Sequence, residues 1–171
     1  MAGDQPTYFG DIDNTEENGP RILATPGYSA YLKIAEGCDN RCSYCVIPSL
    51  RGRYRSRTME ALVAEAEGLA KQGVKELIVV AQDITRYGTD LYGRRCLAEL
   101  CRELKKIEGI EWIRLHYLYP DQFDDELIEE IASNDKIVKY LDIPIQHINN
   151  GILKRMNRRG TGEEIRALIK K

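Results

Sequence analysis

Three cysteines, Cys38, Cys42 and Cys45, stand close together in the stretch GCDNRCSYC with the spacing C-x3-C-x2-C. Thiolates bind soft metals, and this cysteine triad offers three ligands where structural metal sites use four. The other two cysteines, Cys96 and Cys101, belong to an apolar helical pattern, which indicates buried hydrophobic side chains. The triad therefore has no evident fourth ligand nearby in the sequence.

Four kinds of site are compatible with the triad. A disulfide or a redox pair between Cys42 and Cys45 would leave Cys38 without a role. The odd total of five cysteines also favours a reducing compartment, where disulfides are rare. Structural zinc, in a non-catalytic metal-binding module, needs a fourth ligand, for which the candidates are Cys96, Cys101, His116 and His147. An iron–sulfur cluster on three thiolates would leave one iron open for a substrate or cofactor, so the absent ligand would itself be functional.

Apolar patterns place the triad directly after a strand. Strands are predicted at 31–36, 76–81, 111–119 and 138–146, and helices at 58–72, about 96–107, 124–133 and from the capping box Thr161-x-x-Glu164 onward, with Ile165, Leu168 and Ile169 inward. Four such units predict an α/β fold with a parallel sheet. Polar residues alternate along the last two predicted strands. This alternation indicates that one face of the sheet lines a lumen that holds water or a ligand, as in a partial, open (β/α) barrel.

The composition is that of a globular chain. Its 171 residues are 43% hydrophobic and 30% charged, and the net charge of −2 gives no general attraction to nucleic acid or anionic membranes. No apolar run is long enough to span a bilayer, and the N-terminus lacks a signal segment. We therefore expect a cytoplasmic protein with a domain at 28–171. Residues 1–27 are predicted to be a linker or tail, partly disordered.

The triad, with Tyr44 before its last cysteine, resembles the signature of radical S-adenosylmethionine (SAM) enzymes. The stretches at 31–57, 79–93 (VVAQDITRYGTDLYG), 114–120 and 141–160 are similar to the methylthiotransferase branch of that family. Within it they resemble the RimO type, which adds a methylthio group to the β-carbon of an aspartate in a small-subunit ribosomal protein. The MiaB type, which modifies an adenosine in tRNA, is the nearest alternative.

This resemblance implies a 4Fe-4S cluster on the triad, with SAM bound at the open iron through its amino and carboxylate groups. Reductive cleavage of SAM yields a 5′-deoxyadenosyl radical that takes a hydrogen atom from the substrate, so the hard chemistry belongs to the cofactors. SAM contacts are expected from Tyr44, Gln82, Asp83 and Gln146. Of these, Gln82 and Asp83 occupy the strand end that holds the SAM amino group in the family.

The resemblance also implies parts that this sequence does not show. The family's barrel has six units, its N-terminal domain holds a second 4Fe-4S cluster, and a C-terminal domain binds substrate. We therefore expect a domain truncated at its C-terminal side, which alone is not competent for full turnover. The expected partners are the ribosomal protein, an electron donor such as flavodoxin, and ribosomal RNA. The RNA would contact a loop that contains Arg51, Arg53, Arg55 and Arg57.

Overall fold

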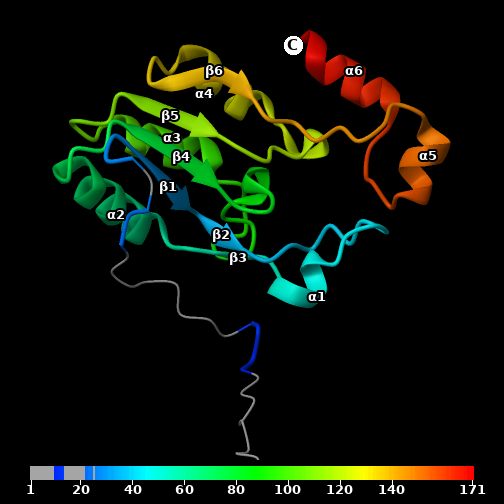
Figure 1. The fold of residues 1–171 in the computed structure, drawn as a ribbon. Helices are drawn as coiled ribbons and strands as arrows, with labels where there is room; N and C mark the ends of the chain where they lie inside the picture. Colours follow the sequence, from blue (N-terminus) through cyan, green and yellow to red (C-terminus); the bar gives the residue numbers. More distant parts are fainter. Residues whose placement is uncertain (1–9, 14–21, 25) are drawn as a thin grey trace, which may run out of the picture.

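The computed structural model describes residues 10–13, 22–24 and 26–171, and its centre is a parallel sheet. The strands lie in the order β1-β4-β5-β6, with bounds Ser29–Lys33, Glu76–Val80, Trp112–Leu115 and Ile137–Leu141. Figure 1 shows this sheet as an open, twisted layer. The predicted α/β class and the four strands are confirmed, although the first strand runs over Ser29–Lys33 rather than 31–36. The last two strands end earlier than expected, because their polar ends at 116–119 and 142–146 leave the sheet as loops.

Three helices follow the strands and pack on the sheet. They are α2 (Met59–Lys71), α3 (Leu97–Lys105) and α4 (Asp125–Ser133), and they contact β1, β5 and β6 respectively. Thr58 caps α2, since its side chain accepts a hydrogen bond from the Ala61 amide at 3.3 Å. Cys96 and Cys101 are buried beside α3, so their interpretation as core side chains is also confirmed.

Several short elements were not predicted. The chain forms a two-stranded antiparallel pair between β2 (Ala35–Glu36) and β3 (Arg55–Ser56), with helix α1 (Ile47–Arg51) between them. Single turns of 3-10 helix, η1 (Ile84–Arg86) and η2 (Pro120–Gln122), follow β4 and β5. These pieces have too few residues to show a period in the sequence.

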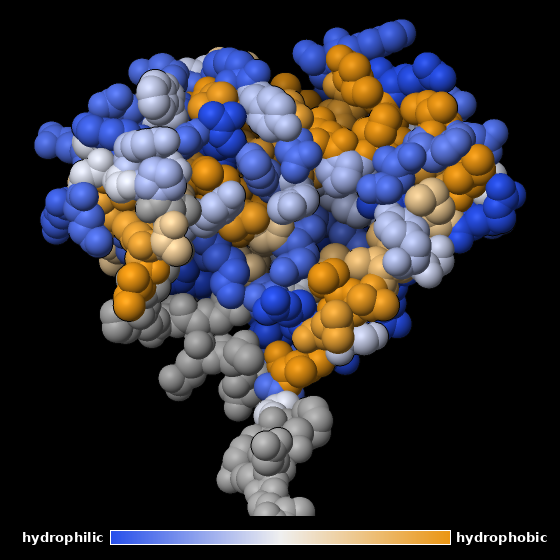
Figure 2. Space-filling view, in the orientation of Figure 1, coloured by the Kyte–Doolittle hydropathy of each residue, from blue (hydrophilic) through white to orange (hydrophobic). Residues whose placement is uncertain are grey.

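After β6 the chain crosses to helices α5 (Asn150–Arg155) and α6 (Gly162–Lys170), on the right in Figure 1. The capping box of Thr161 and Glu164 is confirmed. Ile165 is buried as predicted, but the prediction for Ile169 was wrong, because its side chain is 66% exposed. Figure 2 shows apolar side chains gathered near α6 and again over α1 and the cysteine loop.

The expectation of a linker at residues 1–27 falls largely outside the described residues and stays a prediction. The described Asp13 lies against the loop after α1, where its Oδ1 accepts from the Arg53 amide at 2.8 Å. Within the part of the chain that the structure describes, no helix is both long and apolar enough to cross a membrane.

Candidate functional site

The cysteine triad lines a cavity at the carboxyl ends of the strands. The cavity has a volume of about 430 Å³, which is in the range of small-molecule sites. Its wall combines the triad with residues from the ends of β4, β5 and β6 and from the turn after α5. These include Lys33, Asn40, Tyr44, Gln82, Tyr117, Tyr119, Pro144, Gln146 and Arg158. The structure thus brings Tyr44, Gln82 and Gln146 together with the triad, as the sequence predicts.

The backbone of the cysteine loop, residues 38–45, is held at both ends. Gly37 has a φ of 76°, and a Cβ there would lie 1.9 Å from the Arg53 carbonyl oxygen, so only glycine fits before Cys38. The Cys38 amide donates to the Gly52 carbonyl at 3.2 Å. At the other end the Ser43 amide donates to the Met156 carbonyl at 3.0 Å, which ties the loop to the segment after α5.

Arg158 places a positive charge beside the triad. Its guanidinium carbon lies 3.8 Å from the centre of the Tyr119 ring, and its Nη1 lies 4.0 Å from the Cys42 sulfur. Its Nη2 also donates to the Pro144 carbonyl, so the side chain is fixed in place. The Tyr119 hydroxyl lies 3.6 Å from the same sulfur. A fixed cation here would favour a negatively charged group on the triad.

Two cavity residues have left-handed backbone conformations. Tyr117 and Gln146 each have a φ of 63°, which is uncommon for residues with a side chain. The Tyr117 amide donates to Asp142 Oδ2 at 3.3 Å, and the next amide, of Leu118, donates to the Asp142 carbonyl at 2.9 Å. These contacts hold the turn after β5 against the end of β6. Such strain is typical of sites where a side chain must point in one direction.

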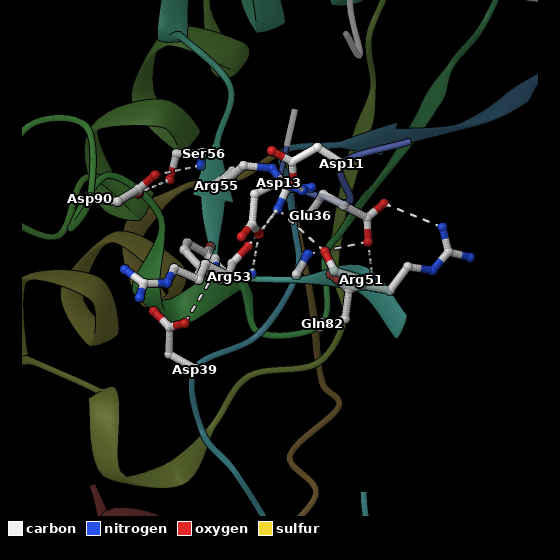
Figure 3. A network of polar contacts seen from close by, with 12 residues as sticks. Asp11, Asp13, Glu36, Asp39, Arg51, Arg53, Arg55, Ser56, Gln82 and Asp90 are labelled. Atoms are coloured by element: carbon white, nitrogen blue, oxygen red, sulfur yellow. Dashed lines mark hydrogen bonds and ion pairs between the residues drawn. The ribbon is translucent and has the colours of Figure 1, made fainter. Parts of the chain in front are cut away.

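Two buried carboxylates stand behind the wall. Glu36, from β2, accepts hydrogen bonds from Gln82 Nε2 and Lys33 Nζ, each at 2.9 Å (Figure 3). Asp83 accepts from Asn40 Nδ2 at 2.9 Å and is fully buried. Burial raises the pKa of Asp83, although the hydrogen bonds from Thr85 and Asn40 act against that rise. The cavity lining includes Gln82 but not Asp83.

The arginine loop is largely engaged within the chain. Figure 3 shows Arg51 near Glu36, with a closest distance of 3.7 Å, and Arg55 paired with Asp13 at 3.1 Å. Arg57 forms an ion pair with Glu65 at 2.7 Å. Arg53 has an exposed side chain. A contact of this loop with RNA stays a prediction.

The thiols of the triad differ in their surroundings from the other two. The triad cysteines are partly exposed, whereas Cys96 and Cys101 are buried. Burial raises the pKa of Cys101 to about 12, so this thiol is unreactive at neutral pH. Burial also raises the pKa of Cys38, so this thiol would have to release a proton in order to bind a metal.

The donor set fits a cluster better than one metal ion. Among the described residues, no three His, Cys, Asp or Glu side chains converge closely enough to hold a single ion. Zinc at about 2.3 Å from each sulfur would require sulfurs about 3.8 Å apart. A 4Fe-4S cube takes one thiolate on each of three irons, so it accepts sulfurs that lie farther apart.

Several residues of the cavity wall were not predicted from the sequence. Asn40 reaches the cavity from within the cysteine loop, and Tyr119 and Arg158 reach it from distant parts of the chain. Glu36 supports the wall from behind. Tyr119 and Arg158 lie in the stretches that resemble the family, 114–120 and 141–160, but nothing in those stretches assigned them a role. The cavity brings Arg158 beside Cys42 although they lie 116 positions apart. His116 and His147, the histidine candidates for a fourth metal ligand, stand outside the cavity lining.

Comparison with known proteins agrees with this site. The profile of the radical SAM superfamily matches residues 32–171. A relative from Clostridium botulinum (strain Hall), named ribosomal protein uS12 methylthiotransferase RimO, is 55% identical over 170 residues, which are 99% of this chain and 38% of that protein. A relative of the same name from Acetivibrio thermocellus is 62% identical over 152 residues, or 89% of this chain and 34% of that protein.

A solved structure shows the same fold. It is that of the radical S-adenosylmethionine methyltransferase TsrM from Kitasatospora setae, with tryptophan substrate and a SAM analogue bound. Its TM-score is 0.70 at 20% identity, and the match covers 93% of this chain and 33% of that one. The family profile, the fold and the cysteine-lined cavity agree, and the chain belongs to the radical SAM superfamily.

Proposed function

We propose that this chain is the catalytic part of a radical SAM methylthiotransferase that acts on an aspartate of ribosomal protein uS12. The observation that supports this most is the cavity itself, which joins three partly exposed thiols to a site large enough for a small molecule. The substrate is assigned from the names of the relatives. Those with 55% and 62% identity are each named a uS12 methylthiotransferase. Ribosomal proteins as substrates imply a reaction in the cytoplasm.

In this proposal Cys38, Cys42 and Cys45 hold a 4Fe-4S cluster whose fourth iron stays open for SAM. The cluster and SAM supply the 5′-deoxyadenosyl radical when bound. The protein binds, orients and shields them: Gln82 receives the SAM amino group, while Tyr44 and Gln146 form other parts of the wall. Arg158 compensates negative charge at the Cys42 side of the cluster.

A second cluster, which the family uses to handle sulfur, would be bound elsewhere in the whole protein. The cysteines of this chain outside the triad are Cys96 and Cys101, both in the core, so they offer no second site. The chain spans only 38% of its relative from Clostridium botulinum. We therefore propose that this chain alone cleaves SAM slowly, and that methylthio transfer requires the sulfur source and substrate contacts of the longer relatives. An external donor such as flavodoxin would supply the electron.

The test is mass spectrometry after anaerobic reconstitution. The protein is incubated with dithionite, SAM, and either uS12 or unmodified tRNA, with and without added sulfide as a sulfur source. The expected result is slow formation of 5′-deoxyadenosine that depends on the cluster, with no methylthio mass shift on either substrate. A shift on tRNA would replace the substrate assignment by the MiaB type. Absence of 5′-deoxyadenosine from cluster-loaded protein would contradict the radical chemistry.

A further inference from the structure

Two side-chain amides in the cavity wall share one hydrogen-bonding arrangement. Asn40 Nδ2 donates to Asp83, and Gln82 Nε2 donates to Glu36, each at 2.9 Å. Both carboxylates are buried, Asp83 completely and Glu36 with 5% exposure. The cavity lining includes both amides and neither carboxylate. Each cavity amide is thus held from behind by a buried acceptor.

The carboxylates determine which way each amide faces. A carboxylate only accepts, so the amide must present its N–H₂ group rather than its oxygen. The other contacts of Glu36 are with donors as well, namely Lys33 Nζ at 2.9 Å, the Gly37 amide at 3.2 Å and Arg51 Nη1 at 3.7 Å. Asp83 in turn accepts from the Thr85 amide at 3.1 Å. Neither amide can therefore rotate its oxygen toward its carboxylate without placing two acceptors together.

The two amide oxygens are left without a donor. Asn40 Oδ1 and Gln82 Oε1 are both shielded from solvent and have no hydrogen-bond partner among the described residues. A buried acceptor with no donor is unfavourable and uncommon in folded proteins. Two of them in the wall of one cavity indicate that a ligand supplies the missing donors.

A similar pair outside the cavity provides the contrast. Asn134 Nδ2 donates to the buried Glu130 at 2.7 Å, which is the same carboxylate–amide arrangement. There the amide oxygen is satisfied, because Asn134 Oδ1 accepts from the Lys136 amide at 3.0 Å. The fold completes this carboxylate–amide arrangement at Asn134 and leaves it open at the two cavity amides. The other buried polar atoms without a partner among the described residues, Arg86 Nη1, His116 Nε2 and Asp121 Oδ1, belong to no such amide.

We propose that Glu36 and Asp83 are positioning residues that orient Gln82 and Asn40, so that two amide oxygens accept hydrogen bonds from the SAM amino group. This inference rests on the proposed function. An amino group has at least two N–H donors whether it is free as an ammonium or bound to iron, so it can satisfy both oxygens. Asp83 then acts through Asn40 rather than by touching SAM, which refines its sequence-based assignment.

The test is a double-mutant cycle read by equilibrium binding. Reconstituted protein is titrated with S-adenosylhomocysteine, which binds without being cleaved, and with its analogue lacking the amino group. Glu36→Gln gives Gln82 a neighbour that can also donate, so the Gln82 amide is free to reverse. We expect about tenfold or more weaker binding of S-adenosylhomocysteine and little change for the analogue. In the Gln82→Met variant, adding Glu36→Gln should not lower the affinity for S-adenosylhomocysteine any further, because the effect of Glu36 passes through Gln82.

Glu130→Gln is the matched control, since it alters the equivalent pair outside the cavity and should leave both affinities unchanged. The inference would be overturned if Glu36→Gln weakened binding of both ligands equally, or if its effect added to that of Gln82→Met. In either case, binding by the wild-type protein would leave the proposed function intact. Wild-type protein that takes up iron but binds neither ligand would overturn both. If Glu36→Gln does not fold, the orientation of the two amides is tested instead by hydrogen exchange of side-chain amides in the wild-type protein. Asn40 and Gln82 should exchange at least about tenfold more slowly than the exposed Gln72, and equal rates would refute the orientation.

Discussion

Replacing Arg158 by glutamine should lower the reduction potential of the bound cluster. The guanidinium lies 4.0 Å from the Cys42 sulfur and is held by Tyr119 and Pro144, so it is a fixed charge beside one ligand. A unit charge at that distance contributes about 4 kcal/mol at an effective dielectric constant of about 20. The added electron spreads over the cluster and the cavity is open, so we take roughly a third of this, about 1.4 kcal/mol.

That free energy corresponds to about 60 mV for one electron. The potential should fall, because a nearby positive charge stabilises the more negative reduced state. The assay is a redox titration of reconstituted protein followed by electron paramagnetic resonance. Arg159→Gln is the matched control, since the neighbouring arginine is exposed and lies outside the cavity. Potentials that agree within about 10 mV for both variants and the wild type would refute the electrostatic role of Arg158.

Three further outcomes follow from the structure. Cys101→Ala should keep its iron and lose about 1 kcal/mol of stability, as measured by chemical denaturation, because the thiol is a core side chain; loss of iron would make it a ligand. Gly37→Ala should lose most of its iron, since the Cβ would collide with the Arg53 carbonyl, whereas Gly27→Ala, with open space around it, should not; equal iron contents would contradict the steric argument. In metal-free protein at pH 8, iodoacetamide should modify the triad and spare Cys96 and Cys101, and mass spectrometry of the peptides shows which thiols react; modification of either buried thiol before the triad would contradict the assignment.

Much of the fold followed from local patterns in the sequence. Continuous apolar runs such as 76–81 are typical of buried parallel strands, and periodic runs with a cap, such as 58–72, are typical of helices on a sheet. These features depend on neighbouring residues, and the structure confirms them in β4 and α2. The pair β2–β3 joins residues about 20 positions apart, and helices α1 and α5 have only five and six residues, too few to show a period, so the sequence did not predict them.

The residues of the candidate site were also predicted only in part. The triad, Gln82 and Gln146 could be predicted because they lie in the cysteine motif or at strand ends, and the structure brings them to one cavity. The roles of Glu36 and Arg158 come from contacts with residues far away in the sequence, namely Gln82 for Glu36 and Cys42 and Tyr119 for Arg158. Asp83 shows the limit of a strand-end rule, since it follows Gln82 directly yet is buried behind the wall.

We propose above that the three partly exposed thiols hold a 4Fe-4S cluster with one open iron. The most direct measurement is the iron and acid-labile sulfide content of anaerobically reconstituted protein, together with the electron paramagnetic resonance spectrum of the reduced protein before and after SAM is added. The account predicts about four iron and four sulfide per chain, a spectrum that changes with SAM, and loss of both in Cys42→Ala. A colourless protein that binds one zinc per chain, or a full cluster whose spectrum ignores SAM, would contradict it.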